Sequence, residues 1–439
     1  MQVPQGVVIL KTIIHPSRAL EEYLTELGLP LSKPQRQHVL RIVEGVIAGT
    51  GRKTLSQLYL QWVDAPDASA AADFLRARVW SEGPLDKLLG EINLAEIIER
   101  AKREGFSPLV YVSIDDSTSV KDKGSHALQG VDWYPDHHGS GRGRPKFKKG
   151  LVHVSCRVTV GIYSLPFSYR LYLRAKTVRR LNRKRSKEER LSFKSKYQLT
   201  REMLQELQPL LPQTWTVYVV FDSWYASAKL IKFIHRQGKH WFCLGAIKSN
   251  RNLDGKRLNQ WNKDLKHKHY HSVELKTVTG SKKTYLTRTL VGRLNGLSID
   301  VCVVISKRHP RDSQPKYYFC TDTSLSVAQI LKRYSKRWAI ETDYWYLKQY
   351  LGLGEFRVQH YEAIHKWYSL VHLALHFLYA KLRRSHERDI PLRSIAQVIE
   401  HHRQQQAQEV LMAACNQAIV EGNTDGVVKR FIIPTRTAA

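Results

Sequence analysis

Acidic side chains stand at the ends of two apolar stretches, where carboxylates can bind a cation or take part in catalysis. Asp115 and Asp116 close or interrupt the run VYVSIDDS, and Asp222 closes the run VYVVFD. A carboxylate in an otherwise apolar strand is costly to bury unless it is paired or bound to a cation. The carboxyl-terminal edge of a parallel strand is also where α/β folds place their ligands. These acids are therefore candidate metal ligands.

A third acid, Glu341, stands in the centre of the aromatic and basic stretch YSKRWAIETDYWYLKQ, residues 334–349. At about 100° per residue on a helix, it falls within a sector of about 60° that also contains Tyr334, Arg337 and Lys348. A neighbouring apolar stripe, typical of a helix face packed on a sheet, consists of Ile340, Tyr344, Leu347 and Leu351. The spacing fits a functional polar ridge, and it also fits an ordinary amphipathic helix whose cations screen one Glu.

Three carboxylates, two from strands and one from a helix, can hold two divalent metal ions. Mg²⁺ suits sparse oxygen ligands and substrate phosphates. One ion would lower the pKa of a water or sugar hydroxyl, and the other would stabilise the leaving oxygen of an in-line displacement. Tyr334, Arg337 and Lys348 would then grip backbone phosphates beside the ions. The residue types favour metal-dependent phosphodiester chemistry.

The charge balance of the sequence also indicates a partner rich in phosphate groups. Among 439 residues, Lys and Arg number 70 against 39 Asp and Glu, which gives a net charge of +31. A surface that basic repels itself unless it meets a polyanion, so nucleic acid is the leading partner. The sequence has no run of 18 apolar residues and no signal-peptide layout. We therefore expect no membrane contact and a cytosolic protein.

The five cysteines include no C-x-x-C pair, and most lie in apolar, strand-like runs. This placement favours buried, reduced thiols over a metal site or a disulfide framework.

The elements that must position the acids change character along the chain. Residues 1–105 have helical periodicity, and two short helices near Arg52, Lys53, Arg76 and Arg78 fit either a helix-turn-helix or a plain helical bundle. From about residue 106 the predicted order is β-β-β-α-β-α-β, with a tight Tyr-Ser turn between the second and third strands. Residues 248–322 predict an antiparallel β insertion, and helices follow it to the end of the chain.

Two basic segments could contact DNA. Residues 141–150, GRGRPKFKKG, contain Arg142 and Arg144 around a glycine in a pattern that looks like the core of an AT-hook. A flexible basic turn is the alternative interpretation. The stretch 174–196 holds eleven Lys or Arg against two Glu. A solvated helix face is the usual meaning of such a run, but in a DNA enzyme it predicts steep salt dependence.

The spacing of Tyr334, Arg337, Glu341 and Lys348 resembles the Tyr-Arg-Glu-Lys signature of a large branch of bacterial insertion-sequence DDE transposases. The surroundings look similar too: IDDS at the first acid, FDSWY at the second, and the continuation LGLGEFRVQHYEAIHKWYSLVHLALHFL. The resemblance covers roughly residues 105–384. It implies an α/β, RNase H-like catalytic core with the β insertion between the second Asp and the Glu.

The same resemblance implies the function and its residues. The metal-binding catalytic triad would be Asp116, Asp222 and Glu341, with Asp115 as the alternative first acid. Two Mg²⁺ ions, replaceable by Mn²⁺, would serve hydrolysis at the element ends and strand transfer into target DNA. Tyr334, Arg337 and Lys348 would contact the transposon end. A homodimer would hold paired terminal inverted repeats in the bacterial cytosol, associated with the nucleoid.

Together these patterns predict five parts. They are a helical, DNA-binding domain over 1–105, the first part of the core over 106–247, the insertion over 248–322, the helix carrying Glu341 over 323–352, and a helical region over 353–439. A DNA nuclease without strand transfer and a non-catalytic DNA-binding regulator derived from a transposase are the alternatives to a transposase.

Overall fold

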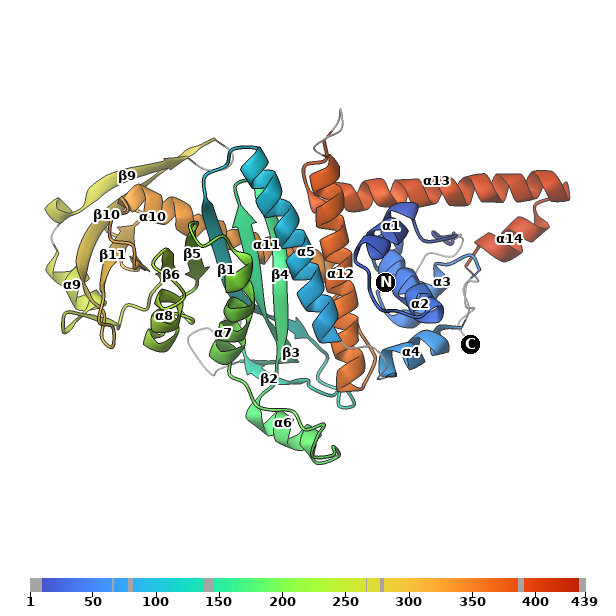
Figure 1. Ribbon diagram of the computed structural model, residues 1–439, viewed down its shortest axis with the longest axis horizontal. Helices are drawn as coiled ribbons and strands as arrows, with labels where there is room; N and C mark the ends of the chain where they lie inside the picture. Colours follow the sequence, from blue (N-terminus) through green and yellow to red (C-terminus); the bar gives the residue numbers. More distant parts are fainter. Residues whose placement is uncertain are drawn as a thin grey trace.

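The computed structural model describes residues 10–64, 67–77, 82–136, 146–265, 267–276, 280–385 and 391–433 of the chain. Within these residues the fold is mixed α/β, with one large mixed β-sheet and helices against it (Figure 1). None of the described helices has the length and apolar character needed to traverse a lipid bilayer.

The described secondary-structure elements that precede the first strand in the chain are all helices. These helices are α1 (Arg18–Glu26), α2 (Lys33–Ala48), α3 (Leu55–Leu60), α4 (Ala68–Arg76) and α5 (Glu82–Arg103). The start of α2 is fixed by a capping box between Ser32 and Gln35, each side chain accepting a hydrogen bond from the other residue's amide. Lys53, one of the cations near the two short helices, is buried before α3 rather than presented to solvent.

Five strands form the centre of the sheet in the order β4-β3-β1-β5-β6. Their bounds are β1 (Leu109–Val120), β3 (Phe147–Val160), β4 (Tyr163–Tyr172), β5 (Thr216–Phe221) and β6 (Trp241–Ala246). β3 is antiparallel to β1 and β4, whereas β5 is parallel to β1 and β6. The predicted order of elements is present with two additions, the short strand β2 (Asp132–Pro135) and the helix α6 (Ala175–Asn182).

The turn between β3 and β4 differs from the prediction. Tyr163 and Ser164 lie inside β4, and the turn falls at Gly161 and Ile162. Gly161 adopts a φ of +58°, a conformation that favours glycine and that tight hairpin turns require. The glycine therefore sets the turn two residues earlier than the Tyr-Ser pair would.

The insertion extends the central sheet. Its elements are β7 (Asn252–Leu253), β8 (Lys256–Arg257), α9 (Leu258–Asp264), β9 (His271–Lys276), β10 (Lys282–Arg293), β11 (Asp300–Lys307) and β12 (Lys316–Cys320). β9 to β12 pair antiparallel, and β12 also pairs antiparallel with β6. The sheet is therefore continuous from β4 to β9, and among the described strands only β7 and β8 form a separate pair.

Two sets of helices pack on opposite faces of the sheet. α5, α7 (Lys196–Leu207) and α8 (Ala228–His235) share one apolar cluster with Val110, Val112 and Ile114 of β1. α10 (Val327–Tyr334) packs through another cluster, and α11 (Trp338–Trp345) contacts β1 and β3. Because side chains alternate along a strand, even-numbered residues of β1 face the first set and odd-numbered residues face α10 and α11.

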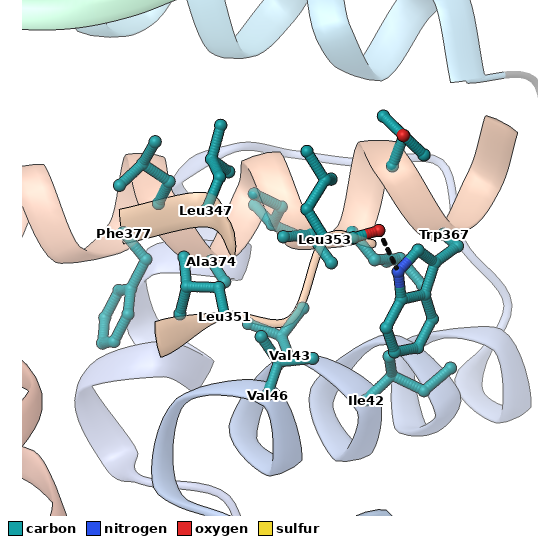
Figure 2. Close-up of a cluster of buried hydrophobic side chains, with 14 of the residues drawn as sticks. Ile42, Val43, Val46, Leu347, Leu351, Leu353, Trp367, Ala374 and Phe377 are labelled. Atoms are coloured by element: carbon teal, nitrogen blue, oxygen red, sulfur yellow. Dashed lines mark hydrogen bonds between the residues drawn. The ribbon is translucent and has the colours of Figure 1, made fainter. Parts of the chain in front are cut away.

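The helix α12 (Tyr361–Ser385) joins the sheet to the N-terminal helices. Figure 2 shows Trp367, Ala374 and Phe377 of α12 in one apolar cluster with Ile42, Val43 and Val46 of α2. The Trp367 indole Nε1 donates a hydrogen bond of 3.3 Å to the Leu353 carbonyl, which anchors the chain that follows α11. This buried cluster fixes the N-terminal helices against the helical layer beside the sheet.

Two helices complete the described chain, α13 (Ile395–Glu421) and α14 (Asp425–Phe431). In Figure 1, α13 starts beside α12, passes the N-terminal helices and ends beyond them, and α14 turns back. Short 3₁₀ turns occupy Gln208–Leu210 and His267–His269. Whether the five predicted parts behave as separate domains stays a prediction.

Candidate active site

The neighbouring acids of β1 lie on opposite faces of the sheet. Asp115 has odd parity with the residues that face α10 and α11, and its Oδ2 accepts a hydrogen bond of 2.9 Å from Arg337 Nη1. Asp116 has even parity and faces α7 and α8. Its Oδ2 accepts a bond of 2.7 Å from Lys196 Nζ, and its Oδ1 accepts one of 3.0 Å from the Tyr225 hydroxyl.

Asp222 lies on the face of Asp115. The parallel register of β1 and β5 pairs Ser113 with Val220 and Ile114 with Phe221, so its continuation by one residue sets Asp222 beside Asp115. Burial raises the pKa of Asp115 to about 7, and the nearby charge of Asp222 adds to the rise against the opposing effect of Arg337. Two carboxylates therefore lie side by side at the carboxyl end of β5. Asp115 keeps its proton to a higher pH than an ordinary Asp does, because its pKa is raised.

Glu341 joins the same face through Arg337. The Arg337 guanidinium donates through Nη1 to Asp115 and through Nη2 to Glu341 Oε1. The side chains of Arg337 and Asp115 are both largely buried, so solvent screens their ion pair weakly. A third donor of the same guanidinium, Nε, is buried without a hydrogen-bond partner. Arg337 therefore bridges two acids and keeps one donor unused.

The segment that carries the signature residues is wound in three ways, where the sequence predicts one uniform helix. α10 ends at Tyr334, a 3₁₀ turn covers Ser335–Arg337, α11 covers Trp338–Trp345, and a π-helical turn covers Tyr346–Tyr350. The 3₁₀ turn winds more tightly than an α-helix and the π turn more loosely. The uniform angle of about 100° per residue therefore does not hold across the segment, although its polar residues still reach the sheet.

Tyr334 and Lys348 lie at the two ends of that segment. The Tyr334 ring packs 4.8 Å from the Tyr318 ring of β12, centroid to centroid. Lys348 Nζ donates a hydrogen bond of 2.6 Å to the hydroxyl of Ser117, another odd-numbered residue of β1. Burial lowers the pKa of Lys348 to about 8. All four signature side chains thus line one face of the sheet edge.

Two protein-family models match the chain. A family model described as "DDE superfamily endonuclease" matches residues 22–274, which is more than half of the chain. The chain belongs to this family. A second model, "Transposase DDE domain", matches residues 194–377. The two ranges together include Asp115, Asp222 and Glu341.

The chain is also similar to proteins of known structure. No curated protein matches the chain. A cryo-EM structure of a piggyBac transposase synaptic complex with hairpin DNA is similar at a TM-score of 0.45 and 11% sequence identity, covering 97% of this chain and 85% of that one.

As a DDE superfamily endonuclease, the protein is a nuclease-type, DNA-cleaving enzyme, and DDE enzymes generally use divalent metal ions. The oxygen donors of Asp115, Asp222 and Glu341 fit that requirement in chemistry. In the part of the chain that the structure describes, no three His, Cys, Asp or Glu side chains are grouped closely enough to hold an ion. Arg337 stands between Asp115 and Glu341, so metal binding by all three acids requires this guanidinium to move.

A buried ion pair, which the sequence did not indicate, anchors the helix that carries Glu341 to the sheet of this endonuclease. Arg157 of β3 pairs with Asp343 of α11, and both side chains are almost fully buried. The Tyr379 hydroxyl of α12 accepts a bond of 3.0 Å from Arg157 and donates one of 2.6 Å to Asp343. The only sequence signal was a lone Arg in the apolar run VHVSCRVTV.

Residues on the opposite face hold the turn that follows Asp222. The Trp224 ring stacks on Tyr197 of α7 at 4.8 Å, and the Trp224 amide donates a bond of 2.9 Å to Asp222 Oδ1. Tyr225 extends from the same turn to Asp116. Asp116 thus contacts the turn after β5 from the face of the sheet that α7 covers. The predicted DNA-binding residues Arg142 and Arg144 lie outside the described residues.

Proposed function

We propose that this endonuclease is a transposase that cleaves DNA at insertion-sequence ends and transfers the freed strand into target DNA. The strand order β4-β3-β1-β5-β6, with three antiparallel strands followed by two parallel ones, supports an RNase H-like core. The net charge of +31 supports double-stranded DNA as the partner, as terminal inverted repeats and as target.

The catalytic acids we propose are Asp115, Asp222 and Glu341, with Asp115 in place of the Asp116 that the sequence resemblance favoured. One observation carries this choice: Arg337 is bonded to both Asp115 and Glu341, on the face to which Asp222 also belongs. Asp116 is engaged on the other face by Lys196 and Tyr225. We infer that Asp116 is a positioning residue that supports the turn after Asp222.

The three acids would hold two Mg²⁺ ions, for which Mn²⁺ would substitute. Bound there, such ions would activate first water and then the freed 3′-hydroxyl, and would stabilise the leaving oxygen. The chain's own residues set up that chemistry. Arg337 carries positive charge between the carboxylates before DNA arrives, and a guanidinium released from them would suit a phosphate oxygen as a hydrogen-bond donor. Tyr334 and Lys348, at either end of the segment, would contact the backbone of the same DNA end.

Substitution of single acids tests the site. On DNA that carries the native element's ends, with Mg²⁺, Asp115→Asn and Glu341→Gln should each lower cleavage by at least about 10³-fold. Asp116→Asn is the matched comparison, since it changes the neighbouring carboxylate in the same way, and it should lower cleavage by only roughly 10–100-fold. If Asp116→Asn abolishes cleavage while Asp115→Asn retains it, the assignment of the first acid is overturned.

Strand transfer separates a transposase from a plain nuclease, which the family name also admits. Wild-type protein given precut ends with free 3′-hydroxyls should join them to plasmid DNA, and Glu341→Gln should not. Cleavage without joining would identify a DNA nuclease instead. Binding without either reaction would identify a non-catalytic regulator. The proposal includes a homodimer on paired ends.

A further inference from the structure

The outer half of α13 carries an uncovered apolar stripe. Leu411 and Met412 are each 61% exposed, Ile419 is 77% exposed, and Cys415 is also exposed. Within the described residues these side chains face solvent on the helix whose far end extends beyond the N-terminal helices in Figure 1. A contiguous group of large, exposed apolar side chains on a protein surface commonly marks an interaction site.

The stripe lies opposite the face by which α13 is packed. With Leu411 at zero, Cys415 and Ile419 fall at about 40° and 80° around the helix, whereas Val410 falls at about 260°. Val410 is buried in a small cluster with Val63 and Phe431, the last residue of α14. The packed face therefore accounts for the position of α13, and the stripe is not needed to hold the helix in place.

Charge indicates what covers the stripe. Residues 404–420 contain a single charged residue, Glu409, in a chain of net charge +31. Two copies of so basic a protein repel each other over most of their surfaces. An uncharged apolar segment at the end of a projecting helix is where that repulsion is weakest and the gain from burial greatest. These properties fit a second copy of this chain better than a polyanion or an acidic partner.

The spacing of the stripe is self-complementary. Leu411 and Ile419 stand four residues before and four residues after Cys415 on the same helix ridge. In an antiparallel pair related by a two-fold axis at Cys415, Leu411 would pack against Ile419 of the partner subunit, and the reverse contact would repeat it. We propose that two copies dimerise through their α13 helices in this arrangement. The proposal supplies the surface for the homodimer of the proposed function.

Sedimentation velocity of the full-length protein without DNA tests the surface. Wild type should form dimers that strengthen as salt rises, because salt screens the repulsion between the two basic chains. The double substitution Leu411→Lys with Ile419→Lys should weaken dimerisation by about tenfold or more. Ile162→Lys, at a 65% exposed position in the turn between β3 and β4, is the matched control and should not weaken it. A wild type that stays monomeric, or a dimer that the double variant leaves unchanged, overturns the proposal.

Oxidative cross-linking tests the arrangement. Cys156, Cys243, Cys302 and Cys320 are buried, so Cys415 is the thiol presented to solvent. Dissolved oxygen with a copper catalyst should take two electrons and two protons from the Cys415 pair and leave a disulfide-linked dimer. Cys415→Ser should abolish the link without weakening the sedimenting dimer. A stable dimer with no Cys415 link overturns the antiparallel two-fold arrangement, and neither result depends on DNA cleavage.

Discussion

Asp115 and Asp116 are consecutive in β1, yet one carboxylate binds Arg337 on the α11 face and the other binds Lys196 on the α7 face. The alternation of side chains along the strand separates their roles. The first carboxylate belongs with Asp222 and Glu341. The second connects β1 to the helix α7 and to the turn after β5.

The support given by Asp116 predicts a graded defect. Asp116→Asn leaves Lys196 without its anion and loosens Tyr225, so cleavage should fall by roughly 10–100-fold because Asp222 is misplaced, not removed. Adding Lys196→Met to Asp116→Asn should recover part of the loss, since the unpaired cation is then gone. Single-turnover cleavage of the two variants measures this. An undiminished rate for Asp116→Asn would show that the contact has no positioning role.

The pair of Arg157 and Asp343 predicts a large stability effect. Removing one partner of a buried ion pair leaves an uncompensated charge, so Arg157→Met should lower the free energy of unfolding by about 3–5 kcal/mol. Urea denaturation measures the change. Arg18→Met, which breaks an exposed pair with Glu22, is the control and should barely move the midpoint. Equal effects of the two substitutions would contradict the role given to the buried pair.

The raised pKa of Asp115 predicts a pH dependence of stability. This pKa of about 7 lies above the ordinary Asp pKa of 3.8, so between these values the folded metal-free protein binds more protons than the unfolded chain. Stability is therefore fully present below about pH 4 and falls as pH rises to about 7, by roughly 2–4 kcal/mol from this group. Thermal unfolding of wild type and Asp115→Asn in chelator should show a slope that the substitution removes.

The same proton competes with metal ions. Ligand carboxylates must be deprotonated, so the apparent affinity for Mg²⁺ should rise by up to about tenfold per pH unit toward pH 7 and level off above it. Calorimetric titration at several pH values gives the profile. Affinity that does not change between pH 5 and 7 would remove Asp115 from the set of metal ligands.

The bridging position of Arg337 predicts opposite effects on two measurements. Arg337→Gln removes the cation that stands between Asp115 and Glu341, so Mg²⁺ should bind at least as tightly as in wild type. Cleavage should nevertheless fall by about 10²-fold or more, because the donor for a DNA phosphate is lost. Calorimetry and cleavage assays on one preparation separate the two effects. Weaker Mg²⁺ binding by this variant would show that the guanidinium supports the metal site instead of competing with it.

The elements that carry the candidate acids can be predicted from the sequence, because their patterns involve residues close together in the chain. The apolar runs before Asp115 and Asp222 and the signature spacing from Tyr334 to Lys348 predict two strands and a helical segment that carry acids and cations. The winding of that helical segment, in contrast, could not be predicted from the sequence. The 3₁₀ turn at Ser335–Arg337 and the π turn at Tyr346–Tyr350 reflect packing against β1 and α12, which no periodicity within one helix records.

The sequence by itself determined the net charge of +31, the apolar strands and the presence of the candidate acids, because charge, burial preference and local spacing are properties of each residue and its neighbours in the chain. Only the tertiary structure placed Asp115 and Asp116 against different helices, and our proposal that Asp115 is the first catalytic acid rests on that placement. It also paired Arg157 with Asp343 and left Leu411 and Ile419 uncovered. Contacts between residues far apart in the chain depend on how layers pack, and that is settled by the whole fold.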